Sequence, residues 1–338
     1  MRSSEGDDLR ARWTGEGESL RDEIFARLSK GHPLDGLPIE RHDGRLDLRG
    51  IAAPEEVPVS SRDLSIRDRI FRFDRVSAVP QIRSAALRGV DLSGARLSGV
   101  MVVDSTIENC RFDGVRWHER GFWGSTIRDS SFRGANLRAF VMGGASDRAT
   151  TGERVDFDEA LLDDVIPGSS DFIDCDFGRA RLRKFEAYGC RLVRCRFAGR
   201  LDEVIFSAVG SSGSSRRGVL EDVDFSAASF RFVSLRGFEL EGVRVPEGPG
   251  HIRFRDYPCV LRRAIDHLRS TEDPDELWLL GLLEHDQQWL GPNQRQGVLA
   301  IGDLHELERI DAGQRFAEWL RQLDGECVRS PFAQSDDP

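Results

Sequence analysis

Apolar residues recur at every fifth position through the centre of the chain. The series begins at Leu87 and continues for twelve steps to Met142. The residue two positions before each apolar residue is usually small, and the residue two positions after it is usually Gly, Asn or Asp. Helices repeat every 3.6 residues and strands every two, so neither produces this spacing. The pattern predicts short extended segments joined by tight corners.

The same period continues further along the chain, with two interruptions. After a break near 145–154, a second series runs from Phe157 to Phe197, with Pro167 and Ala187 as its weak steps. A Gly- and Ser-rich insertion near 207–218 precedes the final series, which ends at Val245. We expect this insertion to form a solvent-exposed loop.

These repeats resemble those of the pentapeptide-repeat family, whose consensus is roughly Ala-Asp/Asn-Leu-x-x. The closest segments are Gly-Val-Asp-Leu-Ser-Gly-Ala-Arg-Leu-Ser at 89–98 and Gly-Ala-Asn-Leu-Arg at 134–138. The resemblance implies a mainly β fold, a right-handed parallel β-helix with a quadrilateral cross-section. Such a solenoid has four pentapeptides, or 20 residues, in each coil. Its ends would be covered by α-helical N- and C-terminal flanks.

Charged residues offer a separate indication of the coil length, because residues 20 apart would lie above one another. Six acidic residues of the second block precede a basic residue by that spacing, which predicts ion pairs that fix the stacking register. The predicted pairs are Glu159–Arg179, Asp163–Arg183, Asp164–Lys184, Asp171–Arg191, Asp174–Arg194 and Asp176–Arg196.

The N-terminal flank, residues 1–80, precedes the solenoid at 81–247. A helix is predicted at 17–31, with Ser19 as N-cap and Gly31 as terminator. Extended pieces at 46–51 and 64–66 are candidates for irregular first coils.

The C-terminal region, residues 248–338, has helical periodicity. Its clearest signal is Asp273-Pro274, which predicts a capped helix ending near Gly291. Helices are also expected at 260–268, at 298–310 and from Asp311 to the residue before Gly325. We expect them to cap the solenoid or to form a homodimer.

Charge is distributed unevenly along the chain, whose net charge is −10. Residues 81–245 carry 24 positive and 24 negative groups, whereas residues 246–338 carry 10 and 18. Some pentapeptide-repeat proteins mimic the shape and charge of B-form DNA and bind DNA gyrase or topoisomerase IV. That mechanism requires a strongly acidic rod, so the electroneutral coils argue against it here.

Two faces of the first coils are candidates for partner contact. One is basic, and its members are Arg96, Arg116, His118 and Arg138. The other carries an apolar stripe, formed by Met101, Val103, Trp123 and Val141. The chain's own N-terminal segment or C-terminal helices would explain the stripe, and a partner or second copy is the alternative.

No sequence motif indicates catalysis. His118-Glu119 is expected at the surface, and His285-Asp286 is expected in a helix cap or on a solvated helix face. Cys175 and Cys195 are expected to be stacked core residues, although a disulfide or metal site is an alternative. The cysteines lack metal-site spacing, so we interpret all six as reduced structural residues. They are Cys110, Cys175, Cys190, Cys195, Cys259 and Cys327.

The sequence favours a non-enzymatic scaffold that binds an unidentified protein. The alternative is a topoisomerase-binding protein of the DNA-mimic type. We expect no catalytic residues, cofactor or metal, no membrane association and no direct nucleic-acid binding. Lys30 and Lys184 are the only lysines, a bias typical of GC-rich bacterial genomes, and a cytoplasmic location is expected because no signal peptide is evident.

Overall fold

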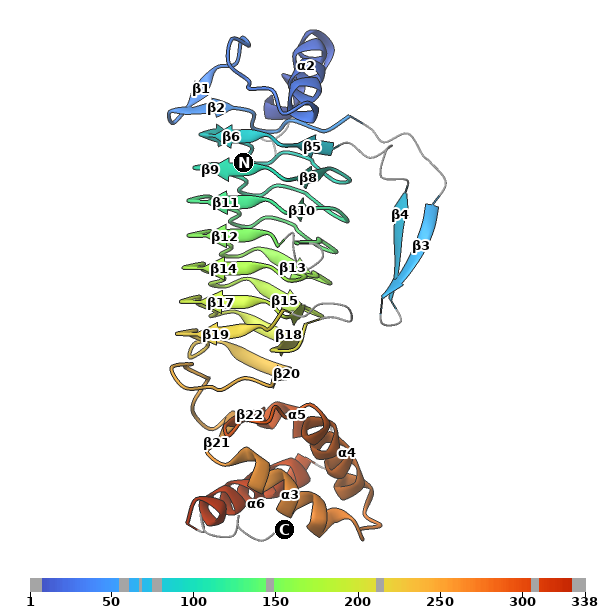
Figure 1. The fold of residues 1–338 in the computed structure, drawn as a ribbon, viewed down its shortest axis with the longest axis vertical. Helices are drawn as coiled ribbons and strands as arrows, with labels where there is room; N and C mark the ends of the chain where they lie inside the picture. The colour runs from blue at the N-terminus through green and yellow to red at the C-terminus, as the bar shows by residue number, and fades with distance from the viewer. Residues whose placement is uncertain are drawn as a thin grey trace.

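The centre of the molecule is a column of stacked coils built from short parallel strands, with helices at both ends (Figure 1). It is seen in a computed structural model that describes residues 8–54, 61–66, 69–74, 81–143, 149–210, 216–304 and 310–329.

The longest sheet of the column contains seven parallel strands. In stacking order they are β6 (Ala86–Arg88), β9 (Thr106–Glu108), β11 (Thr126–Arg128), β12 (Thr151–Glu153), β14 (Asp171–Ile173), β17 (Arg191–Val193) and β19 (Val219–Glu221). Leu87 pairs with Ile107, and Ile107 pairs with Ile127, which confirms the 20-residue step. Ile127 then pairs with Gly152, so this coil contains five additional residues.

Two further parallel sheets complete the described ladders. The first contains β5 (Gln81–Arg83), β8 (Met101–Val103) and β10 (Phe122–Trp123). The second contains β13 (Leu161–Asp163), β15 (Arg181–Arg183), β18 (Arg200–Ser207) and β20 (Ser229–Arg236), with β16 (Glu186–Tyr188) paired to β18. Large apolar side chains fill the column, and Phe157, Phe177 and Phe197 stack in successive coils as predicted.

Corner residues have positive φ angles because each coil must turn sharply between its short strands. Asp104, Asn109 and Asp129 have φ values of 48°, 54° and 49°. Asn and Asp tolerate this left-handed region better than other non-glycine residues. The Gly, Asn and Asp positions of the pattern therefore place the corners correctly.

The N-terminal end is covered by η1 (Gly15–Gly17) and α2 (Glu18–Ser29), which buries Ile24 and Leu28. The prediction that Ser19 caps this helix was wrong, because the turn of η1 continues into α2 and Gly17 becomes the N-cap. Gly31 follows the helix with φ 70°, as its predicted role as terminator requires.

An incomplete coil lies between α2 and the first full coil. It contains β1 (Arg41–His42) and β2 (Arg45–Asp47), and β2 pairs in parallel with β7 (Val90–Asp91). The Leu48 and Gly50 N–H groups donate to carbonyls of the coil below. Residues 46–51 therefore form the irregular coil that was predicted.

The second extended piece, 64–66, was also predicted to form a coil, and this was wrong. It lies in β3 (Ser61–Ile66), which pairs antiparallel with β4 (Arg69–Asp74). The two strands form a two-stranded sheet of their own. Their pairing partner is thus local, and the backbone hydrogen bonds of this piece are not available to a neighbouring coil.

The C-terminal region forms its own hydrophobic core. Its elements are β21 (His251–Phe254), α3 (Tyr257–Leu268), α4 (Pro274–Gln288), β22 (Gly297–Ala300), α5 (Ile301–Leu304) and α6 (Ile310–Arg329). Asp273 caps α4 as predicted, with its side chain accepting hydrogen bonds from the Asp275 and Glu276 N–H groups. The helix predicted at 298–310 was wrong, because Gly297–Ala300 pairs with β21 instead. Helix α6 also continues past Gly325 to Arg329.

Two buried polar side chains join this region to the last coil. Gln294 is 5% exposed; its Oε1 accepts from the Gly237 N–H at 2.7 Å, and its Nε2 donates to the Leu235 carbonyl at 2.9 Å. The Asp303 carboxylate accepts from the Phe232 N–H at 2.9 Å. These contacts satisfy backbone groups at the end of the column that no further coil pairs.

Candidate functional site

The predicted basic face extends along the column. Parallel bridges place Arg96 next to Arg116 and Arg116 next to Asn136. Strand pairing then places Leu161 next to Arg181 and Asp163 next to Arg183 on the following coils. We define the basic face by its charged strand positions and His118: Arg96, Arg116, His118, Arg138, Asp163, Arg181, Arg183, Arg200, Asp202 and Arg231.

The two aspartates of the basic face each bind two arginines. Asp163 lies between Arg138, at 3.0 Å, and Arg181. Asp202 lies between Arg200, at 3.3 Å, and Arg231, at 2.7 Å. The distal half of the face is therefore partly neutralised by its own carboxylates.

Arg96 and Arg116 differ from the other arginines of the basic face. Both are exposed, they are in register on adjacent coils, and neither forms an ion pair with any residue that the structure describes. Like charges that lie directly opposite each other on neighbouring strands are destabilising. Folding therefore does not explain this pair, and an anionic group from outside the chain would neutralise it.

His118 adds little charge to the basic face. It is half-buried, and burial lowers its pKa below the usual value, with Arg138 and Arg116 acting in the same direction against Glu119. The imidazole is consequently neutral at pH 7. The attraction for anions at this end of the face comes from the arginines.

The apolar stripe does not form one exposed patch. Val103 is 7% exposed, and Met101, Trp123 and Val141 are half-buried. The C-terminal helices lie beyond the last coil, far from β8 and β10, so they do not cover the stripe (Figure 1). Because Val103 is buried, it offers no side-chain surface to a partner.

The remaining sequence-predicted charge pairs are partly present. Glu159–Arg179, Asp174–Arg194 and Asp176–Arg196 are ion pairs, at 2.8, 2.6 and 3.2 Å. Asp163 instead binds Arg138 and Arg181, and Asp171 binds Arg216. The structure shows no ion pair between the described residues Asp164 and Lys184.

The expectation that His285-Asp286 lies in a cap or on a solvated face was wrong. The Tyr257 hydroxyl donates to the Asp286 carboxylate, and burial raises the pKa of Asp286. Arg236, 8% exposed, is 3.1 Å from His285 Nε2 and stacks over the Trp289 ring. A cleft of about 290 Å³ adjoins these residues where the column meets the C-terminal region. Their contacts link strand β20 to helices α3 and α4.

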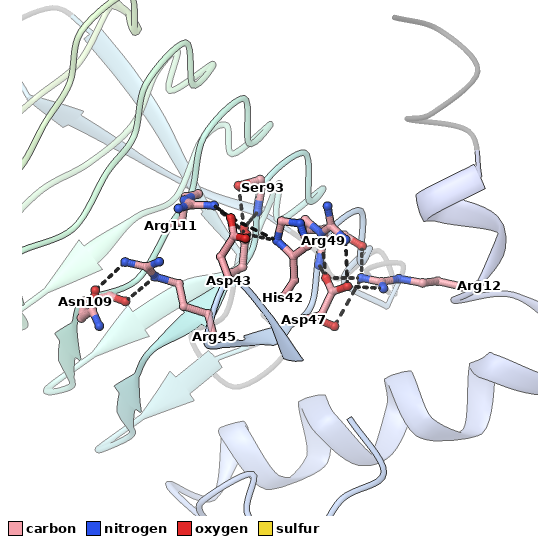
Figure 2. A network of polar contacts seen from close by, with 10 residues as sticks. Arg12, His42, Asp43, Arg45, Asp47, Arg49, Ser93, Asn109 and Arg111 are labelled. Atoms are coloured by element: carbon pink, nitrogen blue, oxygen red, sulfur yellow. Dashed lines mark hydrogen bonds and ion pairs between the residues drawn. The ribbon is translucent and has the colours of Figure 1, made fainter. Parts of the chain in front are cut away.

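A polar network near the N-terminal end joins the incomplete coil to its neighbours (Figure 2). Arg12 donates two hydrogen bonds of 2.7 Å to the Asp47 carboxylate, and Arg49 donates two more, at 2.9 and 3.0 Å. Figure 2 shows both guanidinium groups directed at Asp47. The network was not predicted, because Arg12 and Asp47 are 35 residues apart.

The neighbouring Ser93, Asp91 and His42 are not arranged for nucleophilic catalysis. The Ser93 hydroxyl donates to Asp91 at 2.6 Å, and His42 Nδ1 is 3.4 Å from the other oxygen of the same carboxylate. A catalytic serine must instead donate to the histidine that removes its proton. The group therefore has the geometry of a structural contact around the buried Asp91.

Replacing Asp47 with asparagine is expected to lower the free energy of unfolding by about 2 kcal/mol at pH 7, because it weakens charge-assisted hydrogen bonds. Burial raises the pKa of Asp47, but hydrogen bonds from Arg12 and Arg49 outweigh it and hold the pKa well below 3.8. This stabilisation is present above the unfolded-state pKa and is lost as pH falls toward the folded-state pKa.

Urea unfolding at a series of pH values tests this prediction. The difference between the native chain and Asp47→Asn should shrink steadily below pH 3.8. The exposed Asp22 of α2 provides the control, and Asp22→Asn should change stability by less than about 0.5 kcal/mol. A difference that is the same at acidic and neutral pH would contradict the role assigned to Asp47.

The described residues contain no group of three or more His, Cys, Asp or Glu arranged to hold a metal ion. In the same part of the chain, no helix combines the length and apolar character needed to cross a membrane.

Several solved structures align with this chain. One is a trypsin-treated form of QnrB1, a plasmid-mediated fluoroquinolone resistance protein, with 14% identity, 60% of this chain and 89% of that chain covered, and a TM-score of 0.34. Another is HetL, a pentapeptide repeat protein involved in heterocyst differentiation regulation in Nostoc sp. strain PCC 7120, with 18% identity, coverage of 49% and 83%, and a TM-score of 0.21. No protein-family model and no curated protein matches the chain.

Proposed function

We propose that the chain is a non-enzymatic pentapeptide-repeat solenoid whose basic face binds an acidic surface of another protein. The observation that carries this proposal is the stacking of Arg96 on Arg116 without a described ion-pair partner. The right-handed quadrilateral form of the column is part of the proposal. A closely packed column would present the arginines in fixed positions, which lowers the entropy cost of binding.

The alternative of a DNA mimic has less support. Its acidic rod would need uncompensated carboxylates along the coils. Here Glu159, Asp174 and Asp176 each bind an arginine of the next coil. The charge available to a partner is instead positive and lies on the basic face.

A protein partner is favoured over nucleic acid by the distribution of charge on the basic face. Asp163 and Asp202 interrupt the arginines and each binds two of them. A nucleic-acid backbone presents regularly spaced phosphates, which a continuous positive surface would bind better. An acidic protein surface needs to match only Arg96 and Arg116. The cytoplasmic location and the homodimer through the C-terminal helices stay predictions.

Replacing both Arg96 and Arg116 with glutamine is expected to weaken binding to a poly-glutamate peptide at least about ten-fold, as loss of two interfacial charges implies. Fluorescence anisotropy with the labelled peptide measures the affinity. The double variant should fold with unchanged or slightly higher stability, because it removes the repulsion between the two arginines.

The control is Arg194→Gln, which removes an exposed arginine that is already paired with Asp174. It should leave peptide affinity within about two-fold, as expected for a charge outside the interface. An equal loss in the control would exclude a specific role for the Arg96–Arg116 pair. Tighter binding of a DNA duplex of equal charge would overturn the assignment of a protein partner.

A further inference from the structure

Four of the six cysteines are enclosed in the column. Cys110, Cys175, Cys190 and Cys195 are free and at most 2% exposed. Burial raises the pKa of Cys110 to about 11 and that of Cys190 to about 12. Since the thiolate is the reactive form, these residues are protected from thiol chemistry. Cys175 and Cys195 are core residues, as predicted.

The other two cysteines form a disulfide, which corrects the interpretation that all six are reduced. Cys259, in the first turn of α3, is bonded to Cys327, in the last turns of α6, across a sequence separation of 68 residues. Cys327 is 2% exposed, whereas Cys259 is only half-buried. The two sulfur atoms therefore differ in their accessibility to a reagent from solution.

Polar contacts hold the two helix ends together on both sides of the disulfide. Asp324 of α6 accepts hydrogen bonds from the Arg255 N–H and side chain, at 2.8 and 3.0 Å, and from the Asp256 N–H at 3.3 Å. Arg263 of α3 binds Glu326 at 2.6 Å. These contacts do not depend on the disulfide, so they would keep the two sulfur atoms adjacent after reduction.

We propose that Cys259 and Cys327 form a reversible site of thiol–disulfide exchange with small thiols and disulfides, in which Cys259 is the sulfur that reacts with the reagent. In reduction, a thiolate attacks Cys259 Sγ, the protein disulfide breaks, and Cys327 leaves as a thiolate that takes a proton from water. A second thiol then releases Cys259, and the reagent becomes a disulfide.

Oxidation proceeds through the same intermediate in reverse. The Cys259 thiolate attacks a small disulfide and releases one thiol, which leaves a mixed disulfide at Cys259. The Cys327 thiolate then displaces the second thiol and restores the protein disulfide. The position of Cys259 at the N-terminal end of α3 assists these steps, because the helix dipole stabilises a thiolate there.

The bond encloses the part of the chain that covers the end of the column. Gln294 and Asp303, which bind the edge of the last coil, both lie between the two cysteines in the sequence. Reduction should therefore loosen the cover without unfolding the column. The site connects the thiol–disulfide balance of the surroundings to the stability of the C-terminal region.

Reduction of the native full-length chain by dithiothreitol, followed by maleimide labelling and peptide mass spectrometry, is the direct test. Labels are expected at Cys259 and Cys327 and not at the four buried cysteines. Removing the reductant and adding oxidised glutathione should restore the disulfide. Trypsin should cleave the C-terminal region at least about five-fold faster in the reduced form, because local opening becomes more frequent. A bond that resists reduction until the chain is denatured would overturn the proposal.

Single serine variants identify the reacting sulfur. With oxidised glutathione, Cys327→Ser should form the mixed disulfide at Cys259 at least about ten-fold faster than Cys259→Ser forms one at Cys327, because Cys327 is buried. Equal rates, or faster reaction at Cys327, would contradict the assigned order. Far-UV circular dichroism of both variants, together with the native-chain labelling, separates a chemical effect from misfolding.

Discussion

Replacing Phe177 with alanine is expected to lower the free energy of unfolding by about 4 kcal/mol. Phe177 is 2% exposed, and its ring stacks between those of Phe157 and Phe197, with centroid distances of 4.9 and 4.5 Å. Each coil is fixed by hydrogen bonds to its neighbours, so the backbone cannot close around the removed ring. The substitution therefore leaves a cavity, and the contacts on both sides of it are lost.

Urea unfolding monitored by far-UV circular dichroism measures this effect. Phe177→Leu should lose less stability than Phe177→Ala, because leucine fills part of the cavity. Val219, on the column surface and 37% exposed, provides the control, and Val219→Ala should cost about 0.5 kcal/mol or less. If the interior alanine and surface alanine variants had equal stability, the ring stack would not be the source of column stability.

The column could be predicted from sequence because its determinants are local and repeated. Each inward residue is buried by the coils above and below, so the same side-chain requirement recurs every five residues. The pairing of Leu87 with Ile107 confirms the 20-residue step. The step of 25 residues from Ile127 to Gly152 could not be placed, because a corner accommodates additional residues without changing the inward pattern.

The charge contacts were harder to predict than the strand register. Arginine side chains are long, so each can choose among several nearby carboxylates. Asp163 is bound by Arg138 and Arg181, although Arg183 is its neighbour in the ladder. The full basic face was missed for a different reason, since extending the 20-residue register past the first block would have identified Arg181 and Arg183.

Contacts in the C-terminal region depend on helix packing, which the local pattern does not encode. Cys259 and Cys327 are 68 residues apart in the sequence and become adjacent only because α3 packs against α6. The cysteine spacing therefore gave no signal of the disulfide. The strand at Gly297–Ala300 was mistaken for a helix because its pairing partner, β21, lies more than 40 residues earlier.

Replacing Gln294 with leucine is expected to cost about 3 kcal/mol, through loss of the hydrogen bonds that join the C-terminal region to the last coil. Leucine has a similar volume but leaves the Gly237 N–H and the Leu235 carbonyl without the partners that Gln294 provides. Those backbone groups lie at the end of the column, where desolvation without a partner is costly.

The expected readout is hydrogen–deuterium exchange at Gly237 and at the neighbouring residues of β20, which should become at least about ten-fold faster in Gln294→Leu. Exchange in β9 and β11, several coils away, should be unchanged, because each coil contacts only its neighbours. Asn293→Ala is the matched control, since Asn293 is exposed and adjacent in sequence. If exchange rose equally along the whole column, Gln294 would stabilise the molecule globally and would not act as a local cap. Exchange that stayed unchanged at Gly237 would show that the backbone edge is protected by other groups.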